Sequence, residues 1–224
     1  MQNTEIIVTK DMGEKLATRP LYEQAFDDPK GFVDYYYEEK IKDNTMVICK
    51  EAGRVISMLH LNPYTIVVNG KEAPVYYVVA VATDKNHRRQ GYMARVLDVA
   101  FDEMKQEGIP FCFLLPVDEA IYTDFGFETI CPFFVRGSEE AALSYEEIEQ
   151  AFDVYCKQDA IYLRRRQTEE TLAQAGDAEL LPMSPVIMAA VTNKETCAKL
   201  FGVKDDRDLL KYMKSKRCYF CEEV

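Results

Sequence analysis

The first half of the chain changes its hydrophobic period from helical to strand-like near residue 45. Residues 12–26 place apolar side chains among charged ones at helical spacing, and 31–41 do the same with more aromatic side chains. Both patterns predict amphipathic helices. The segments 45–50 and 54–61 are short apolar runs separated by a Gly-containing turn, which predicts a pair of antiparallel strands.

The clearest turn signal is Asn69-Gly70, which follows the apolar run 66–68 and precedes 75–83. An Asn-Gly pair between apolar runs is typical of a two-residue β-hairpin. Segment 75–83 (VYYVVAVAT) is almost continuously apolar, which predicts a central strand covered on both faces. A helical pattern at 91–106 and a buried strand at 111–115 complete a strand–helix–strand unit, right-handed by default.

The order of elements predicts an α/β fold, with helices flanking a central mixed sheet. A short helix at 118–125 and a last strand at 126–134 close this part. After residue 136 the pattern changes, so we expect a first domain at 1–136 and a small α+β appendage at 137–224. The elements expected in the appendage are charged helical segments at 144–177, a strand at 186–191, one or two helices at 194–214 and a terminal strand at 218–224.

Composition narrows the class of protein. Apolar residues make up 48% of the chain, which is enough for a buried core, so disorder is not expected. The net charge of −11 argues against a nucleic-acid binder, which normally has a basic face. No apolar run approaches 18 residues, and residues 1–5 do not resemble a secretory signal. We therefore expect a cytoplasmic protein that contacts neither nucleic acid nor membrane.

The seven cysteines are an odd number and are scattered along the chain. Without an export signal, free buried thiols are a better interpretation than a disulfide framework. Cys218 and Cys221 have C-x-x-C spacing, but no second ligand pair accompanies them, so we expect no metal site.

The segment most indicative of chemistry is 81–94 (VATDKNHRRQGYMA), where a loop enters a helix. A helix N-terminus has unpaired N–H groups and a positive dipole, which suit a pyrophosphate. Gly91 lets the backbone approach the phosphates, and Arg88 and Arg89 add positive charge. No Lys-Ser/Thr pair follows the glycine and no G-x-G-x-x-G is present, which argues against nucleotide-binding motifs of those two kinds.

Arg88-Arg89-Gln90-Gly91 resembles the first half of the Q/R-x-x-G-x-G/A motif of the GNAT acetyltransferase superfamily. Met93 stands where that motif has a small residue, and Ala94 follows it. Segment 115–127, with Ile121-Tyr122 and Phe125-Gly126-Phe127, is similar to an "IY…FG(F/Y)" element of the Eis-like acetyltransferases. The chain therefore resembles a shortened form of that group.

This resemblance implies a GNAT fold with a splayed sheet, and acetyl-CoA as the acyl donor. It implies that the backbone of Val81, Ala82 and Thr83 pairs with the pantetheine arm. Tyr122 matches the tyrosine that acts as general acid on the leaving thiolate, and a phenol is a proton donor at neutral pH. The residues implied to hold the pyrophosphate are Arg88, Arg89, Gln90, Gly91, Tyr92, Met93 and Ala94.

The general base and the acceptor pocket stay open at this point. The candidate bases are the C-terminal carboxylate of Val224, by analogy with the Eis group, and Asp118, Glu119 or His60. For the acceptor pocket the expected residues are His60, Tyr36 and Asp118.

Three functions fit these features. The first is an N-acetyltransferase acting on a small-molecule or peptide amine by direct transfer. The second is a GNAT-fold module that senses acyl-CoA without turnover. The third is an acyltransferase for a longer acyl group or a hydroxyl acceptor, for which bulky Met93 would alter donor preference. The appendage would cap the acceptor site or form a homodimer contact.

Overall fold

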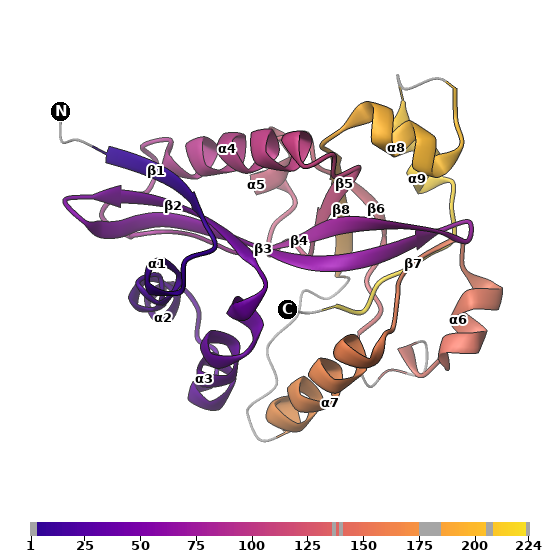
Figure 1. Cartoon of the computed structure of the whole chain (residues 1–224), viewed down its shortest axis with the longest axis horizontal. Helices are drawn as coiled ribbons and strands as arrows, with labels where there is room; N and C mark the ends of the chain where they lie inside the picture. Colours follow the sequence, from indigo (N-terminus) through magenta and orange to yellow (C-terminus); the bar gives the residue numbers. More distant parts are fainter. Residues whose placement is uncertain (1–3, 136–137, 139–140, 175–184, 205–207, 223–224) are drawn as a thin grey trace. The chain divides into compact units, whose positions relative to one another are not determined.

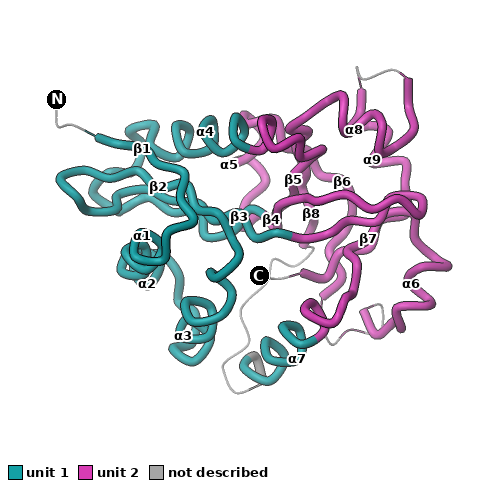
Figure 2. Tube along the Cα trace, in the orientation of Figure 1, with its two compact units in different colours: residues 1–63, 78–103, 164–179 teal, residues 64–77, 104–163, 180–224 magenta. Residues whose placement is uncertain are grey.

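The computed structural model describes residues 4–135, 138, 141–174, 185–204 and 208–222. The chain forms two compact units that interleave along the sequence (Figure 2). Unit 1 contains residues 1–63, 78–103 and 164–179, and unit 2 contains 64–77, 104–163 and 180–224. The elements that pass from one unit into the other are β3 (Arg54–Val68), β4 (Lys71–Thr83), α4 (Tyr92–Gln106) and α7 (Ala160–Gln174).

Unit 1 begins with a strand that the sequence analysis did not predict. This strand, β1 (Thr4–Thr9), pairs antiparallel with β2 (Thr45–Glu51), and β2 pairs antiparallel with β3. Within this unit, α1–α3 lie on one side of these strands and α4 lies on the other (Figure 1). The sheet of unit 1 is therefore covered on both faces by helices.

The expected helix at 12–26 is two helices, α1 (Met12–Leu16) and α2 (Arg19–Ala25). Pro20 lies in the first turn of α2, where it lacks the N–H that a continuous helix would need. The second expected helix is α3 (Lys30–Glu38), followed by a 3₁₀ turn, η1 (Lys40–Lys42). The sequence thus located the helical layer but missed its break.

Residues far along the chain also belong to unit 1, through the second part of α7. The buried Lys40 Nζ lies 3.0 Å from Glu169 Oε1, with the two side chains 4% and 6% exposed. Tyr35 donates to the same carboxylate oxygen at 3.4 Å, and Arg165 Nη2 lies 2.9 Å from Asp43 Oδ2. Since a buried charge is costly unless it is paired, the Lys40–Glu169 contact holds α7 against the N-terminal helices.

In unit 2, β4 and β5 (Phe111–Leu114) are parallel, as the strand–helix–strand pattern predicted. Strand β8 (Val186–Val191) lies between β5 and β6 (Glu128–Pro132) and is antiparallel to both. The strand predicted at 186–191 is thus confirmed, and it is a sheet neighbour of strands from the first 136 residues. The domain boundary at residue 136 stays a prediction.

The stretch expected to be helical at 144–177 contains a strand. Helix α6 (Tyr145–Ala151) is followed by β7 (Val154–Cys156), and only then by α7. Strand β7 pairs antiparallel with β3 at 66–68 and parallel with β9 (Cys218–Tyr219). The remaining helices of unit 2 are α5 (Ala120–Thr123), α8 (Lys194–Phe201) and α9 (Leu209–Lys214).

Two local predictions are confirmed. Asn69 and Gly70 have φ of 48° and 78°, the left-handed values that a type I′ hairpin turn requires. All seven cysteines are free and buried. The architecture is a mixed sheet flanked by helices, which confirms the expected α/β class.

Candidate cofactor site

The site begins at the end of β4, in unit 1. Ala80 has φ of 50°, an unusual value within a strand, which marks an irregularity shortly before the strand ends. The ladder between β4 and β5 consists of Tyr76↔Cys112 and Tyr77↔Phe113, so residues 78–83 continue β4 beyond it. Val81, Ala82 and Thr83, whose backbone was expected to meet the pantetheine arm, all lie in this continuation.

Two carbonyl groups of this segment have side-chain donors. Ser57 Oγ donates to the carbonyl of Ala82 at 3.1 Å, and Arg88 Nε donates to the carbonyl of Thr83 at 3.2 Å. A carbonyl oxygen has two lone pairs, so each can accept a second hydrogen bond.

The loop after β4 is held by its first residue, Asp84. The backbone N–H of Asp84 donates to the carbonyl of Ile56 at 2.8 Å, and the N–H of His87 donates to the carbonyl of Asp84 at 2.8 Å. Asp84 Oδ1 accepts from the N–H of Asn86 at 3.0 Å. Asp84 is buried, with 5% of the whole residue exposed. No role for this aspartate was predicted from the sequence, although Asp84 lies only three residues before His87.

The backbone before α4 has the conformation expected for an anion site. Arg89 and Gly91 have φ of 61° and 81°, and a Cβ added at Gly91 would meet no atom of the described residues within 4 Å beyond its chain neighbours. The carbonyl of Gly91 accepts from the N–H of Arg95 at 3.1 Å, which starts the helix. The first N–H groups of α4, those of Tyr92, Met93 and Ala94, therefore have no acceptor within their own helix. An anion beside Gly91 would accept hydrogen bonds from these N–H groups.

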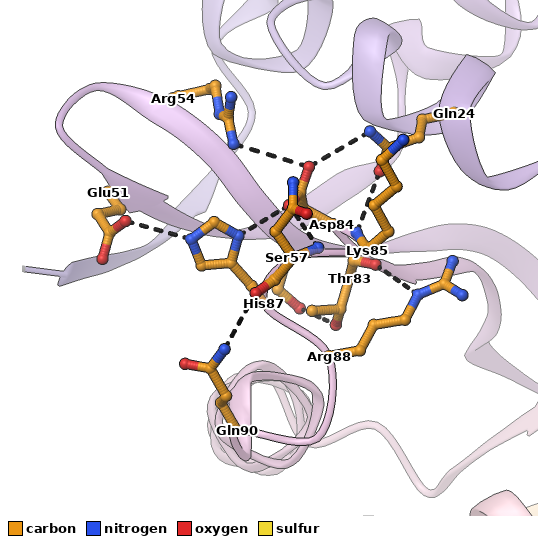
Figure 3. A network of polar contacts seen from close by, with 11 residues as sticks. Gln24, Glu51, Arg54, Ser57, Thr83, Asp84, Lys85, His87, Arg88 and Gln90 are labelled. Atoms are coloured by element: carbon orange, nitrogen blue, oxygen red, sulfur yellow. Dashed lines mark hydrogen bonds and ion pairs between the residues drawn. The ribbon is translucent and has the colours of Figure 1, made fainter.

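The polar side chains of the loop form a network of contacts, in which Arg88 and Gln90 take part (Figure 3). Arg88, Arg89 and Gln90 are exposed, and Gln90 Nε2 donates to the carbonyl of Asn86 at 3.1 Å. The structure thus gathers the residues from Arg88 to Ala94 at one helix N-terminus with two exposed guanidinium groups. These features fit a pyrophosphate.

The expected acceptor residues His60 and Tyr36 lie together in unit 1, in a closed cluster. Tyr36 Oη and His60 Nδ1 are 2.9 Å apart, the rings stack with centroids 5.7 Å apart, and both side chains are 0% exposed. His60 Nε2 has no hydrogen-bond partner among the described residues. Burial, with a smaller effect of the Lys15 charge, lowers the pKa of His60 to about 3. His60 is therefore a neutral imidazole near pH 7.

This burial gives a stability prediction. Because His60 has a lower pKa when folded than when unfolded, the unfolded chain takes up a proton first as the pH falls. The free energy of unfolding is expected to fall by an extra ~1.4 kcal/mol for each pH unit below about 6. Urea unfolding of wild type and His60→Gln at pH 7, 6 and 5 measures the free energy of unfolding at each pH. This free energy should fall less steeply with decreasing pH in the variant than in wild type. Equal slopes would contradict a neutral buried His60.

Tyr122 and Asp118 belong to unit 2, at α5. Tyr122 is half-buried, and its ring packs edge-on against Phe127 with centroids 5.8 Å apart. Burial raises the pKa of Tyr122 to about 12, so the phenol keeps its proton across the neutral range. Asp118 is exposed, and its Oδ1 accepts from the N–H of Ala120 at 3.0 Å. Glu119 accepts a hydrogen bond from Thr129.

Val224, the other expected catalytic residue, lies outside the described residues. Among the helices that the structure describes, none is long and apolar enough to cross a membrane.

The chain belongs to the GNAT acetyltransferase family. The family model described as "Acetyltransferase (GNAT) domain" matches residues 13–130, more than half of the chain. This match covers the end of β4, the loop, α4 and α5. Acetyl-CoA is the typical cosubstrate of the family, which confirms the expected cofactor at the level of the family. No curated protein sequence matches the chain.

Solved structures share the fold at low sequence identity. A probable N-acyltransferase of unknown function from Enterococcus faecalis V583 matches with a TM-score of 0.54 and 14% identity, over 58% of this chain and 33% of its own. Eis1 from Mycobacterium abscessus matches with a TM-score of 0.53 and 15% identity, over 75% and 48%. The YhbS protein from Escherichia coli, crystallised with CoA, matches with a TM-score of 0.50 and 19% identity, over 58% and 71%.

This chain therefore spans about a third of the length of the E. faecalis protein and about half of Eis1. At these identities the likeness shows the fold alone.

Proposed function

We propose that this protein is an N-acetyltransferase that moves the acetyl group of acetyl-CoA directly to the amine of a small molecule or peptide. The observation that carries the proposal is the geometry at the start of α4. There the left-handed backbone at Arg89 and Gly91 and the open space beside Gly91 adjoin the first N–H groups of a 15-residue helix. The family match over residues 13–130 supports it independently.

In this proposal the segment from Arg88 to Ala94 holds the pyrophosphate through backbone N–H groups and two guanidinium groups. The backbone of Val81, Ala82 and Thr83 holds the pantetheine arm. Acetyl-CoA supplies a thioester whose acyl carbon an amine can attack. Each of these protein groups binds and orients, which removes the entropy cost of bringing donor and acceptor together.

Tyr122 is the general acid of the proposed reaction. As the new N–C bond forms and the C–S bond breaks, Tyr122 Oη donates its proton to the departing sulfur. The raised pKa of Tyr122, caused by burial, keeps that proton in place near neutral pH. The amine loses one proton to a base, for which Val224, Glu119, Asp118 and His60 stay the candidates, and the Tyr122 phenolate regains a proton from solvent before the next turnover.

A relation to the Eis-like acetyltransferases is the finer part of the proposal. It is supported by segment 115–127 and by the shared fold with Eis1 from M. abscessus. We also place the protein in the cytoplasm, with a homodimer contact formed by the C-terminal part. The alternative function is an acyl-CoA sensor without turnover, which the same cofactor loop would serve.

The test is a calorimetric titration of acetyl-CoA into the purified protein, followed by an amine panel with detection of released thiol. We expect micromolar affinity, weakened about tenfold by Arg89→Ala, because one exposed guanidinium beside the pyrophosphate is lost. The control is Lys199→Ala, which removes an exposed cation on α8 and should leave the affinity unchanged. Tight binding with no turnover on any amine would favour the sensor, and no binding would overturn both functions.

A further inference from the structure

The imidazole of His87 lies between two carboxylates at the cofactor loop (Figure 3). His87 Nδ1 is 2.8 Å from Asp84 Oδ1, and His87 Nε2 is 3.2 Å from Glu51 Oε2. The three side chains are mostly buried, with 17%, 8% and 16% exposure for His87, Asp84 and Glu51. We name this arrangement the His87 bridge.

The geometry favours a protonated ring. A neutral imidazole has one N–H donor and one lone pair, whereas ionised carboxylates only accept hydrogen bonds. Both contacts of the His87 bridge are therefore hydrogen bonds only when both ring nitrogens have a proton. In agreement, the hydrogen bond to Asp84 is the largest cause that raises the pKa of His87, and the bond to Glu51 adds to it. The same contact is the main cause that lowers the pKa of Asp84 to about 2.

The other groups around the ring do not reverse the preference of His87 for the protonated state. Arg54 Nη2 is 3.7 Å from Asp84 Oδ2, the oxygen that does not face His87, and Arg54 is 67% exposed. Gln24 Nε2 donates to the same oxygen at 3.3 Å and is uncharged. The ring of Tyr92 meets the imidazole edge-on, with centroids 5.9 Å apart. Two close carboxylates thus outweigh one exposed and more distant guanidinium.

The positions of the three residues give the His87 bridge a mechanical role. Asp84 follows the last residue of β4, and Glu51 is the last residue of β2. His87 directly precedes Arg88 in the loop, and its ring contacts Tyr92, the first residue of α4. The bridge therefore ties the middle of the loop to the ends of two strands and to the start of the helix.

We propose that protonated His87 is a positioning residue for acetyl-CoA, because its two charge-assisted hydrogen bonds hold the loop 84–91 in the conformation that receives the pyrophosphate. This inference rests on the proposed function. Loss of one ring proton removes one of the two donors and leaves a carboxylate facing a nitrogen lone pair. The bridge is complete below the raised pKa of His87 and is lost as the pH rises through it, so cofactor affinity falls in that direction.

The first measurement needs no ligand. The chain has two histidines, so proton NMR of the ring signals follows both, and His60→Gln identifies the signal of His87. We expect the pKa of His87 to exceed 6.5, and Glu51→Gln to lower it, because that variant removes the negative charge of one of the two acceptors. A His87 titration that is the same in wild type and Glu51→Gln would overturn the bridge.

The second measurement is the affinity for acetyl-CoA from pH 6.0 to 8.5, by calorimetry on wild type, His87→Gln and Glu51→Gln. From pH 6.0 to 8.5, we expect the affinity of wild type to fall about tenfold more than that of His87→Gln. This is the effect of losing one charge-assisted hydrogen bond. Ionisation of the ligand itself is common to both proteins and cancels in the comparison.

Glu51→Gln separates positioning from simple charge. Removing a negative charge near the pyrophosphate would tighten binding if charge alone mattered, whereas loss of the bridge weakens binding at pH 6.0. The control is Asp98→Asn, which removes an exposed carboxylate of α4 and should not weaken binding. Tighter binding by Glu51→Gln, or parallel pH profiles for wild type and His87→Gln, would overturn the inference while acetyl-CoA binding itself stands. No binding by wild type at any pH would overturn both proposals.

Discussion

Replacing Tyr122 by Phe is expected to lower kcat by about 10²- to 10³-fold while the dissociation constant of acetyl-CoA changes less than twofold. A positioned general acid typically contributes a factor of this size, and the substitution removes only the proton donor. The phenol of Tyr122 makes no hydrogen bond to another described residue, and its ring contact with Phe127 is kept by phenylalanine. The fold should therefore tolerate the change. Steady-state kinetics and calorimetry on the same preparation measure the two quantities.

A matched control is Tyr212→Phe, which removes a phenol on α9 whose ring contacts Phe201 and Lys216. This variant should retain wild-type kcat. Because burial raises the pKa of Tyr122 to about 12, wild-type kcat should show no alkaline loss attributable to this residue below about pH 10. Unchanged turnover in Tyr122→Phe would remove the tyrosine from the mechanism and leave cofactor binding untouched.

Replacing Gly91 by Ala is expected to weaken acetyl-CoA binding by about 30-fold. Part of the reason is backbone strain, since φ of 81° costs an alanine about 1–2 kcal/mol and shifts the loop toward other conformations. The larger part is steric. Apart from its chain neighbours, no atom of the described residues lies within 4 Å of the added Cβ, so under the proposed function the group that it would obstruct is the pyrophosphate.

Gly70→Ala is the control for Gly91→Ala. Gly70 has φ of 78° and equally open surroundings, but it lies in the hairpin turn between β3 and β4. Both variants should lose similar thermal stability, and only Gly91→Ala should lose affinity in calorimetry. Equal affinities in the two variants would place the pyrophosphate elsewhere.

Taken together, the two substitutions separate the candidate functions. An acyl-CoA sensor requires the loop at Gly91 but has no use for the proton of Tyr122. An acetyltransferase requires both. The sensor function predicts that Gly91→Ala weakens acetyl-CoA binding. It also predicts that Tyr122→Phe has no effect with any amine tested.

Local sequence determined those features whose cause lies within a few residues. Asn69-Gly70 adopts left-handed backbone because those residue types tolerate it, and the turn then fixes the hairpin of β3 and β4. The helical period at 91–106 gave α4 almost to the residue, and the loop before it was recognisable from its glycine and arginines. The break between α1 and α2, which the prediction of one helix over 12–26 missed, also has a local cause, because Pro20 lies in the first turn of α2.

Other features depended on partners distant in the sequence, and only the tertiary structure decided them. The three residues of β7 have too little pattern to stand out between helical segments, and they become a strand because β3 and β9 pair with them. Burial, which no local pattern specifies, makes His60 a neutral ring. Glu51 and His87 are 36 residues apart, and their contact exists because β2 and β4 end close together. The hydrophobic period of the sequence indicates where helices and strands form. Which strands become neighbours, which side chains are buried and which charges pair is decided only when the chain has folded.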